Sequence, residues 1–482
     1  MLGWSCTRWL ALAGAAAGLA ACSVDMPPAS VTAPAPLQWN APLPHGGTLG
    51  DLRAWWQAQN DPVLLALIDD AQALSPTVAA ALGRIETARA NEATAQAALL
   101  PNLTAGVSSA RSLSLPATPA ATSTAATLQT NWEIDVFGAA RVARTALAGQ
   151  TQGNMAQWHD ARVSVAAEVA NTYYALAHCW KAHDLAAQEL LSRQRSRDIS
   201  ARSLQAGMLA PTAYAQVQAE VAQSQLRLTQ QASQCALQTK AMVALTGEDE
   251  ALVRSVMQER TLPDDLAGFA VEQVPAQALV QRPDVFAAEH DVALASAQIG
   301  RAKARRWPGL TLGGSIGALR YSTMGVESDI TTWSFGPLAL TLPVFDAGQR
   351  AALVDAASAD YVAAVSAYRA KVRQAVREVE EALVTLQSAQ EREADTRAVL
   401  QARVQNHAAA QNRERSGMAS ALDVEDALRL MLGAQADVLA LQLERKRAWV
   451  ALYRAVGGGW QRAQAAQPAS QPSQPSGQVP AN

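Results

Sequence analysis

The chain has 482 residues, 17% of them charged and 5% aromatic, and its formal net charge is −3 at pH 7. A chain so close to neutrality lacks the basic surface that nucleic-acid binding requires, so we expect no nucleic-acid partner. After residue 22 no apolar run approaches the roughly 18 residues that a membrane-spanning helix needs.

The N-terminus is typical of a secretory signal peptide over residues 1–21. A single positive charge at Arg8 precedes an apolar run that ends in Leu19-Ala20-Ala21-Cys22. The small residues before the cysteine resemble a lipobox, which predicts that Cys22 becomes the lipidated first residue of the mature chain. Ser23, in place of an aspartate, resembles an outer-membrane address, so we expect the acyl chains to sit among outer-membrane lipids. The alternative is an ordinary signal peptide followed by a chance cysteine.

Two further segments lack the periodicity of secondary structure. Residues 22–50 are rich in proline and glycine, and they predict an extended, lipid-anchored arm. Residues 461–482 are rich in proline, serine and glutamine. They predict a disordered tail, because such a segment buries too little apolar surface to become ordered.

The region between these segments carries an internal repeat. Pro76 and Pro101 bracket a helical stretch, and Pro283 and Pro308 bracket another of equal length 207 residues later. Matched spacing of this kind indicates a tandem duplication. A unit of this type cannot bury its apolar faces alone, so it needs a symmetric partner.

The duplication divides the chain into two similar halves. We predict repeat 1 at 51–250 and repeat 2 at 276–460, joined by a connector at 251–275. Each repeat is expected to contain a helix, two strands, a very long helix, a tight turn and a returning helix.

Proline-free windows predict four long helices, at 138–206, 211–245, 346–415 and 420–455. The longer helix of each repeat ends at Gly207 or Gly417, since glycine tolerates the left-handed cap. From Tyr361 to Ala389 apolar residues follow alternating steps of four and three, which is the pattern of coiled-coil packing. A soluble helical bundle is the alternative, although helices of ~100 Å are unusual in a globular core.

Alternating apolar and small polar residues predict four strands, at about 102–113, 123–136, 309–320 and 330–343, with connections at 112–126 and 322–329. Each strand is long enough to cross a bilayer at a tilt. Four aromatic residues are expected near strand ends, as in an interfacial girdle: Trp132, Trp307, Tyr321 and Trp333. Two ordinary surface hairpins are the alternative. Four strands cannot close a barrel, but several protomers together could.

Motifs for catalysis, metals and cofactors are weak. The G-x-S-x-G pattern at 313–317 lies inside an alternating strand, whereas a nucleophile elbow needs a strand-to-helix turn. His178, Cys179 and His183 have spacings that do not converge on a metal. The glycines at 457–459 predict a helix end, because no strand precedes them. We therefore predict no catalytic residue, no metal site and no cofactor.

Four segments have the sequence of a known family: Trp55-Trp56 with Asp61-Pro62-Val63-Leu64, Trp132-Glu133-Ile134-Asp135-Val136-Phe137-Gly138, Leu342-Pro343-Val344-Phe345-Asp346-Ala347-Gly348, and Ala451-Leu452-Tyr453-Arg454-Ala455-Val456-Gly457-Gly458-Gly459-Trp460. They resemble the outer-membrane factors of tripartite efflux systems, which are TolC-like channels, and specifically the lipoprotein NodT branch. The segments span nearly the whole mature chain, and the last is highly specific.

The resemblance implies a mixed α/β membrane protein that forms a homotrimer. Each protomer would supply four strands to a 12-stranded outer-membrane β-barrel, continuous with a long periplasmic α-helical coiled-coil barrel. The duct would passively conduct small molecules, such as drugs and toxic compounds, from an inner-membrane pump of the RND type and a periplasmic membrane-fusion adaptor. No enzyme activity is implied, because energy enters at the pump. The alternatives are a type I protein secretion channel and, in another class, a structural coiled-coil lipoprotein or adaptor.

The resemblance also points to a periplasmic aperture near the start of the last helix. In the family a hydrophobic residue and a carboxylate four positions later ring the constriction, which corresponds here to Leu422 and Asp426. Arg429 could bridge the carboxylates, and Asp423 is an additional carboxylate that could change which ring is narrower. The alternative is that these residues are solvated helix caps or intersubunit pairs.

The tips of the two helical hairpins are predicted to dock the adaptor. The turns at Gly207-Met208 and Gly417-Met418 lie farthest from the strands and therefore deepest in the periplasm. Plain helix caps are the alternative interpretation, and both roles are compatible.

A disulfide between Cys179 and Cys235 would clamp the first hairpin. Both cysteines lie 28 residues from Gly207, so an antiparallel hairpin places them at the same height. The periplasm is oxidising, and a disulfide there can form and persist. Equal height does not ensure that the side chains face each other, so two small buried cysteines remain the alternative.

Overall fold

The computed structural model describes residues 24–36, 54–113, 120–258, 263, 265–269, 279 and 282–460. The signal peptide, Cys22, the tail at 461–482 and part of the connector at 251–275 lie outside the described residues.

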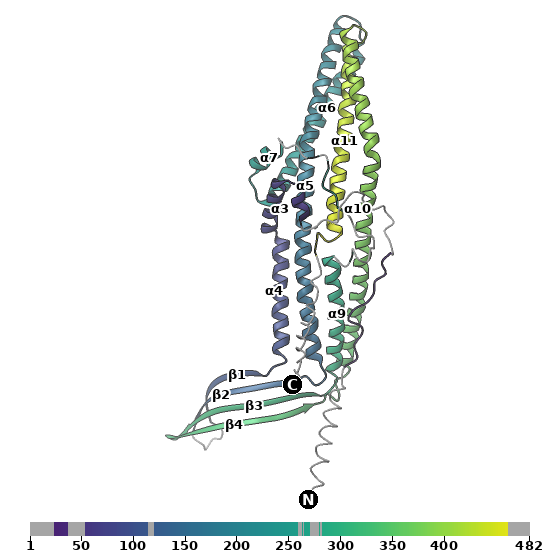
Figure 1. Cartoon of the computed structure of the whole chain (residues 1–482). Helices are drawn as coiled ribbons and strands as arrows, with labels where there is room; N and C mark the ends of the chain where they lie inside the picture. The colour runs from purple at the N-terminus through teal and green to yellow at the C-terminus, as the bar shows by residue number, and fades with distance from the viewer. Residues whose placement is uncertain are drawn as a thin grey trace, which may run out of the picture.

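Two long helical hairpins form a tall column (Figure 1). They consist of α5 (Ala139–Gln205) with α6 (Pro211–Thr246), and α10 (Gln349–Arg415) with α11 (Ala421–Ala455). Helices α5 and α10 have 67 residues each, which corresponds to about 100 Å at 1.5 Å per residue. Among the described helices none is long and apolar enough to span a membrane alone, although the bent pair Pro62–Leu74 and Pro76–Ala97 meets that criterion jointly.

Helix α10 begins three residues later than the predicted start at 346. Ala347 and Gly348 adopt left-handed backbone conformations, with φ of 52° and 89°. The Asp346 carboxylate accepts hydrogen bonds from the backbone N–H groups of Gly348 (3.0 Å) and Arg350 (3.1 Å). This local turn satisfies the first free N–H groups of the helix, so regular helical geometry starts only after it.

The helices lie side by side in two tiers. Near the tips the order is α6, α5, α11 and α10, and below them it is α4 (Pro76–Ala97), α5, α9 (Pro283–Ala304) and α10. Helix α9 therefore continues the column of α11, and α4 takes the corresponding place in repeat 1. The duplication seen in the sequence thus gives a layer of helices in which equivalent helices have equivalent neighbours within their repeat.

A buried arginine joins the three helices that meet at this junction. Arg282 donates to the Ala455 carbonyl (2.6 Å), to both carboxylate oxygens of Asp284 (3.0 and 2.8 Å) and to Glu378 (2.9 Å). Burial by itself raises the pKa of Asp284, but hydrogen bonds and charge from Arg282 outweigh it and lower that pKa. The end of α11 is thus tied to α9 and α10.

The largest hydrophobic core lies midway along the column. There α2 (Trp55–Ala58), α3 (Pro62–Leu74) and α7 (Glu250–Gln258) pack against the long helices. The ring of Trp55 stacks on Tyr453 with centroids 4.8 Å apart. Asp61 accepts a 2.7 Å hydrogen bond from the Tyr173 hydroxyl, and it also caps α3. These contacts hold the short helices against α5 and α11.

The predicted coiled-coil pattern on α10 matches the burial. Its positions from Val372 to Ala389 are buried against neighbouring helices, and the earlier positions Tyr361, Val365 and Tyr368 are half-buried. Spacing alone therefore located the face of α10 that packs inward.

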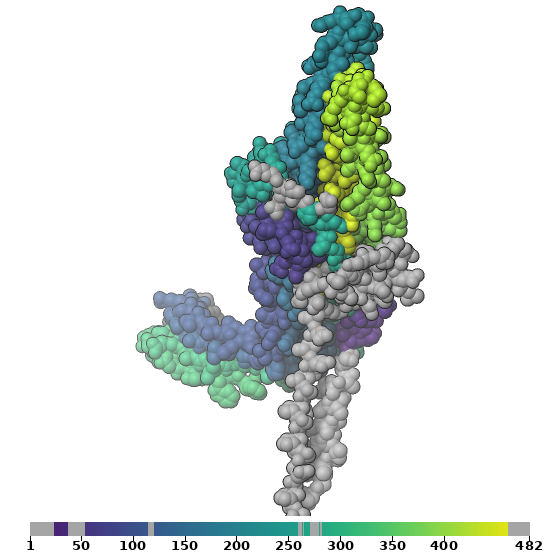
Figure 2. Space-filling view, turned by 45° about the horizontal axis from the view of Figure 1, so that its top comes forward, coloured from purple at the N-terminus to yellow at the C-terminus, as the bar shows by residue number. Residues whose placement is uncertain are grey.

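A four-stranded antiparallel sheet lies at the end of the column opposite the tips (Figures 1 and 2). Its strands are β1 (Asn102–Ser112), β2 (Ala121–Ile134), β3 (Gly309–Thr323) and β4 (Val326–Thr341), in the order β1-β2-β3-β4. One hairpin comes from each repeat, and the pairing of β2 with β3 unites them.

The β3–β4 connection is shorter than the predicted loop at 322–329. The strands remain paired up to Thr323 and Val326, and the turn consists of Met324 and Gly325, with φ of 52° and 78°. Two consecutive positive φ values are the geometry of a tight hairpin turn. As a result Trp333 lies in mid-strand opposite Ile316 and not near a strand end, contrary to the sequence-based expectation.

Candidate functional site

The sheet has one apolar and one polar face. Residues paired across antiparallel strands share a face, so the register assigns each paired residue to one face. A register shift between Leu312 and Gly314 interrupts the pairing of β3 with β4. The apolar face carries Leu103, Ala105, Val107, Ala126, Leu128, Trp132, Leu310, Leu312, Ile316, Ala318, Trp333, Phe335, Leu338 and Leu340. The opposite face carries Thr104, Gly106, Ser108, Thr127, Gln129, Asn131, Gly313, Ser315, Gly317, Thr332 and Ser334. Toward the hairpin end this face also carries apolar residues, namely Leu319, Tyr321, Val326 and Ile330.

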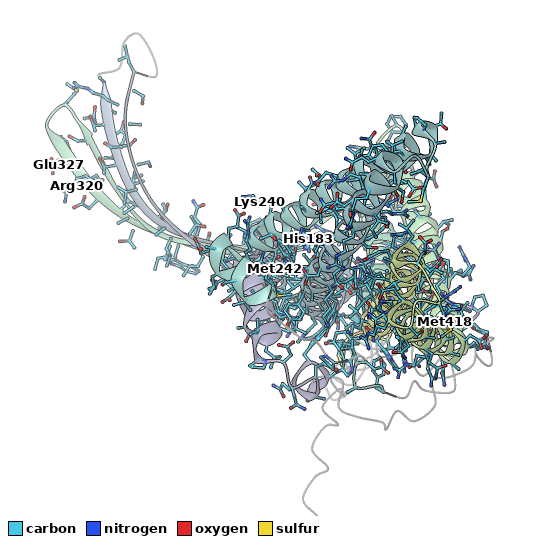
Figure 3. All side chains as sticks on the ribbon, turned by 90° about the horizontal axis from the view of Figure 1, so that it is seen from above. His183, Lys240, Met242, Arg320, Glu327 and Met418 are labelled. Carbon is cyan, nitrogen blue, oxygen red and sulfur yellow. A yellow bond between two sulfur atoms is a disulfide. The ribbon has the colours of Figure 1, made fainter. Side chains whose placement is uncertain are left out.

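Charged side chains on the apolar side gather toward the hairpin end of the sheet. Arg320 and Asp329 are cross-strand partners joined by hydrogen bonds of 2.8 and 3.1 Å. Figure 3 shows Arg320 and Glu327 far from the helical column. From Leu310 to Ala318 the apolar face extends about 26 Å along the strand at ~3.3 Å per residue. At the tilt of about 40° that is usual in membrane barrels, this length corresponds to a height of ~20 Å, most of a membrane's apolar band.

The hairpin tips are Schellman-type turns in both repeats. Gly207 and Gly417 have φ of 72° and 73°. The N–H of Met208 donates to Ser203 (2.9 Å) and the N–H of Met418 donates to Arg413 (2.8 Å). Both methionines are exposed at the tips. The turns thus close the helices and also present apolar side chains at the far end of the column.

Near the second tip, Asp423 acts as a helix cap. It forms a capping box with Ser420, whose N–H donates to the Asp423 carboxylate (2.8 Å) while Asp423 N–H donates to the Ser420 hydroxyl (3.2 Å). The hydrogen bond from the Ser420 N–H is the main cause that lowers the pKa of Asp423. Asp423 is therefore a helix cap, the alternative to an aperture role that the sequence left open.

Of the other residues predicted for the aperture, Arg429 forms a contact between helices. Leu422 is half-buried, and Asp426 forms an ion pair with Arg429 one turn further along α11. Arg429 also donates to the hydroxyls of Ser192 and Ser196 on α5, at 3.0 Å each. The guanidinium thus ties α11 to α5 close to the tip.

Ser192 and Ser196 were not among the residues predicted from the sequence. Both are buried, and their spacing of four places them on one face of α5. Small hydroxyl residues at that spacing, level with an arginine on the matching helix, are the signal that could have found them.

Cys179 and Cys235 form a disulfide, with Cα atoms 5.5 Å apart. Both are buried, and the Gln231 amide donates to the Cys179 carbonyl at 3.2 Å. The bond joins α5 to α6 midway along the first hairpin. In Figure 3 His183 and Met242 are labelled on these two helices.

A polar groove of about 990 Å³ lies between α5, α10 and α11. On α11 it is lined by Arg447, Ala451 and Arg454, whose steps of four and three define one helix face. Trp449 and Tyr453 lie on the opposite face and belong to the hydrophobic core. The groove therefore opens on the face of the helical column opposite to α2, α3 and α7.

Charged residues of both signs line this groove. Its carboxylates are Glu168, Glu378, Glu381 and Glu444. Burial is the main cause that lowers the pKa of His178 at the edge of the groove, and the charges of Arg447 and Lys446 lower it further. His178 is therefore neutral at pH 7.

The G-x-S-x-G motif lies within a β-strand, as its alternating sequence predicted. Gly313, Ser315 and Gly317 lie on the polar face of β3, where the Ser315 hydroxyl is 2.8 Å from that of Ser334. In the described ranges no group of three or more His, Cys, Asp or Glu side chains is placed to hold a metal ion.

The sequence matches the family described as "Outer membrane efflux protein" twice in succession, over residues 67–248 and 274–458. The chain is 30% identical to pyoverdine export outer membrane protein OpmQ of Pseudomonas putida, covering 94% of this chain and 98% of that protein. It is 27% identical to toluene efflux pump outer membrane protein TtgC of Pseudomonas putida, covering 96% and 98%.

A solved structure has the same fold. A membrane protein from Pseudomonas aeruginosa superposes with a TM-score of 0.74 at 27% identity, covering 90% of this chain and all of that one. The chain belongs to the outer membrane efflux protein family. Its helical column and β domain have the fold of these outer-membrane channels, which are not enzymes, and the assignment made from sequence resemblance is confirmed.

Proposed function

We propose that this protein is the trimeric exit duct of a tripartite efflux pump in the outer membrane. The observation that carries the proposal is the two-faced sheet at one end of a ~100 Å helical column. An apolar face suits lipid, a polar face of small residues suits a water-filled channel, and the column reaches across the periplasm.

The open edges of the sheet support a trimer. Among the strands that the structure describes, β1 and β4 lie at the edges. Bilayer hydrocarbon cannot satisfy their free backbone groups, so a spanning sheet must close on itself. Pairing of β4 with β1 of the next protomer, repeated three times, gives a barrel of 12 strands.

The proposed cargo is small molecules. The names of two similar proteins refer to pyoverdine export and to toluene efflux. In a closed ring of helices, the polar groove between α5, α10 and α11 would face the duct. Its mixed charges and neutral His178 suit the passage of varied solutes without tight binding.

The proposed partners are a periplasmic adaptor and an inner-membrane pump of the RND type. The exposed Met208 and Met418 lie at the end of the column farthest from the sheet, where the adaptor would dock. Leu422 and Asp426 would form the periplasmic aperture, held narrow by the contacts of Arg429 with α5. A lipid on Cys22 would add a second membrane attachment.

A deletion strain tests the function. Cells that lack the gene should retain more of a fluorescent efflux dye and become more susceptible to toxic solutes, and the wild-type gene should restore both. A parallel comparison of secreted proteins covers the alternative of type I secretion. Normal dye efflux together with the loss of one secreted protein would overturn the small-molecule proposal.

A further inference from the structure

The N-terminal arm, residues 24–36, lies extended along the groove between α9 and α10, where Figure 1 shows it as a purple trace beside α10. Three side chains of the groove donate hydrogen bonds to carbonyl oxygens of the arm: Ser296 to Pro27 (2.6 Å), Tyr361 to Pro28 (2.9 Å) and Lys303 to Asp25 (2.8 Å). Proline has a carbonyl but no N–H, so the donors at Ser296 and Tyr361 suit the carbonyl oxygens of Pro27 and Pro28.

A glycine of α9 makes room for the arm. A Cβ atom added to Gly300 would overlap the thioether of Met26. The backbone at Gly300 is ordinary helix, where glycine is unfavourable by about 1 kcal/mol relative to alanine. The missing side chain therefore serves the close approach of Met26 and not a special backbone conformation.

The other end of the arm completes a hydrophobic cluster. Val31, Ala33 and Ala35 are half-buried, and the alternate residues Thr32 and Pro34 are exposed, which is the period of an extended strand lying on a surface. Ala33 and Ala35 pack on a cluster formed by Leu279, Val285, Val372 and Ala375. The arm therefore covers this cluster together with Tyr368 and Val376.

The matching groove of repeat 1 lacks these features. At the spacing of 207 residues that relates Pro76 to Pro283, Gly300 corresponds to Ala93, Ser296 to Arg89 and Lys303 to Gln96. Ala93 carries a Cβ where Gly300 has none, so the hollow is specific to repeat 2, and Arg89 and Gln96 stand in place of Ser296 and Lys303. The duplication alone therefore does not produce this groove in both repeats.

We propose that the α9–α10 groove is a binding site for an extended, proline-containing peptide, and that its resident ligand is the arm of the same chain. Docking of the arm holds α9 against α10 in the half of the column next to the sheet. The four prolines of the arm restrict its freedom before docking, so less conformational entropy is lost on binding. This role is separate from the conduction of solutes and from any lipid on Cys22.

The test uses hydrogen exchange of α9 in the full-length protein in lipid nanodiscs. In one variant residues 24–36 are replaced by a Gly/Ser sequence of equal length, with Cys22 and Ser23 retained. We expect amides of α9 to exchange at least about tenfold faster, because the local opening free energy falls. A synthetic peptide with the sequence of residues 24–36 should restore slow exchange, and a scrambled peptide should not.

Point variants test the groove itself. Gly300→Leu should accelerate exchange of α9 although the arm is intact, and Met26→Gly should partly reverse this effect. Gly83→Leu is the matched control, because among the described residues nothing lies within 4 Å of a Cβ added there on α4. Unchanged exchange after arm replacement, or equal rescue by the scrambled peptide, would overturn the proposal.

Discussion

Arg429 shows how one side chain near the tip connects two helices that belong to different repeats. Its guanidinium donates to two hydroxyls on α5 and pairs with Asp426 on its own helix. Hydrogen bonds to a charged group contribute about 1.5–3 kcal/mol each, so the two bonds to buried serines favour the observed arrangement. The pair with Asp426 adds less, because that carboxylate is exposed to solvent.

Removing this contact should widen the periplasmic aperture. We expect Arg429→Met to raise single-channel conductance in planar bilayers, because α11 loses its contact with α5. Leu422→Ala combined with Asp426→Ala should raise it as well. Arg197→Met is the control, since Arg197 is a half-buried residue of α5 that pairs with its neighbour Asp198 and not with α11 in any contact described. Conductance equal to that of the wild type in both aperture variants would contradict the assignment.

The Cys179–Cys235 bond should stabilise the first hairpin. The cysteines are 56 residues apart, and closing a loop of that length removes about 4 kcal/mol of unfolded-state entropy in the chain-entropy model. We expect the double variant Cys179→Ala/Cys235→Ala to lower the opening free energy of α6, measured by hydrogen exchange. Thiol labelling of the unfolded, unreduced wild type provides the control. Labels at both positions before reduction would show that the bond is absent.

At the scale of the element, a charged substitution should reduce trimer assembly on the apolar face of the sheet and have little effect on the polar face. Leu128 lies in the middle of the apolar face, and its neighbour Gln129 lies on the polar face. An arginine at the bilayer midplane costs about 2–4 kcal/mol, whereas a lumen-facing arginine remains hydrated.

We therefore expect Leu128→Arg to reduce the amount of trimer assembled in the outer membrane, and Gln129→Arg to leave it nearly unchanged. Heat-resistant trimer on gels of purified membranes measures this difference. Equal losses from the two neighbouring positions would mean that the apolar face does not meet lipid.

The hairpin tips are a second element with a testable role. Bulky substitutions, Gly207→Val and Gly417→Val, place β-branched side chains in the left-handed region, and we expect them to abolish dye efflux while trimers persist in the membrane. Gly207→Asn keeps the backbone conformation and should retain function. Gly433→Val on α11 is the control, with open space around the added side chain in the described structure. Normal efflux in both tip variants would remove the docking role.

At the scale of the whole molecule, assembly and anchoring can be read in one measurement. Native mass spectrometry of the detergent-solubilised protein should give a trimer in which each chain starts at Cys22 with added acyl mass. Three chains are expected because four strands cannot close and twelve can. A stable monomer or a tetramer would contradict the barrel, and an unmodified N-terminus at another residue would contradict the lipid anchor.

The amino-acid sequence alone determined the features that depend on neighbours along the chain. Helix and strand periodicities repeat within a few residues, so the long helices, the paired strands and the buried positions of α10 could be predicted. The matched spacing of prolines after Pro76 and after Pro283 is also visible along the chain, so it revealed the duplication. The equal distances of Cys179 and Cys235 from Gly207 placed them level, since a hairpin is also a local structure.

Features that form where distant segments of the chain come into contact could be seen only in the tertiary structure. The predicted loop at 322–329 is a two-residue turn in the structure, because the cross-strand register extends both strands. The alternation of residues within one strand cannot specify that register. Ser192 and Ser196 gained a role only when α11 packed beside α5. The arm in the α9–α10 groove is the plainest case: Met26 and Gly300 lie far apart in sequence, and side-chain complementarity exists only where the folded chain brings them into contact.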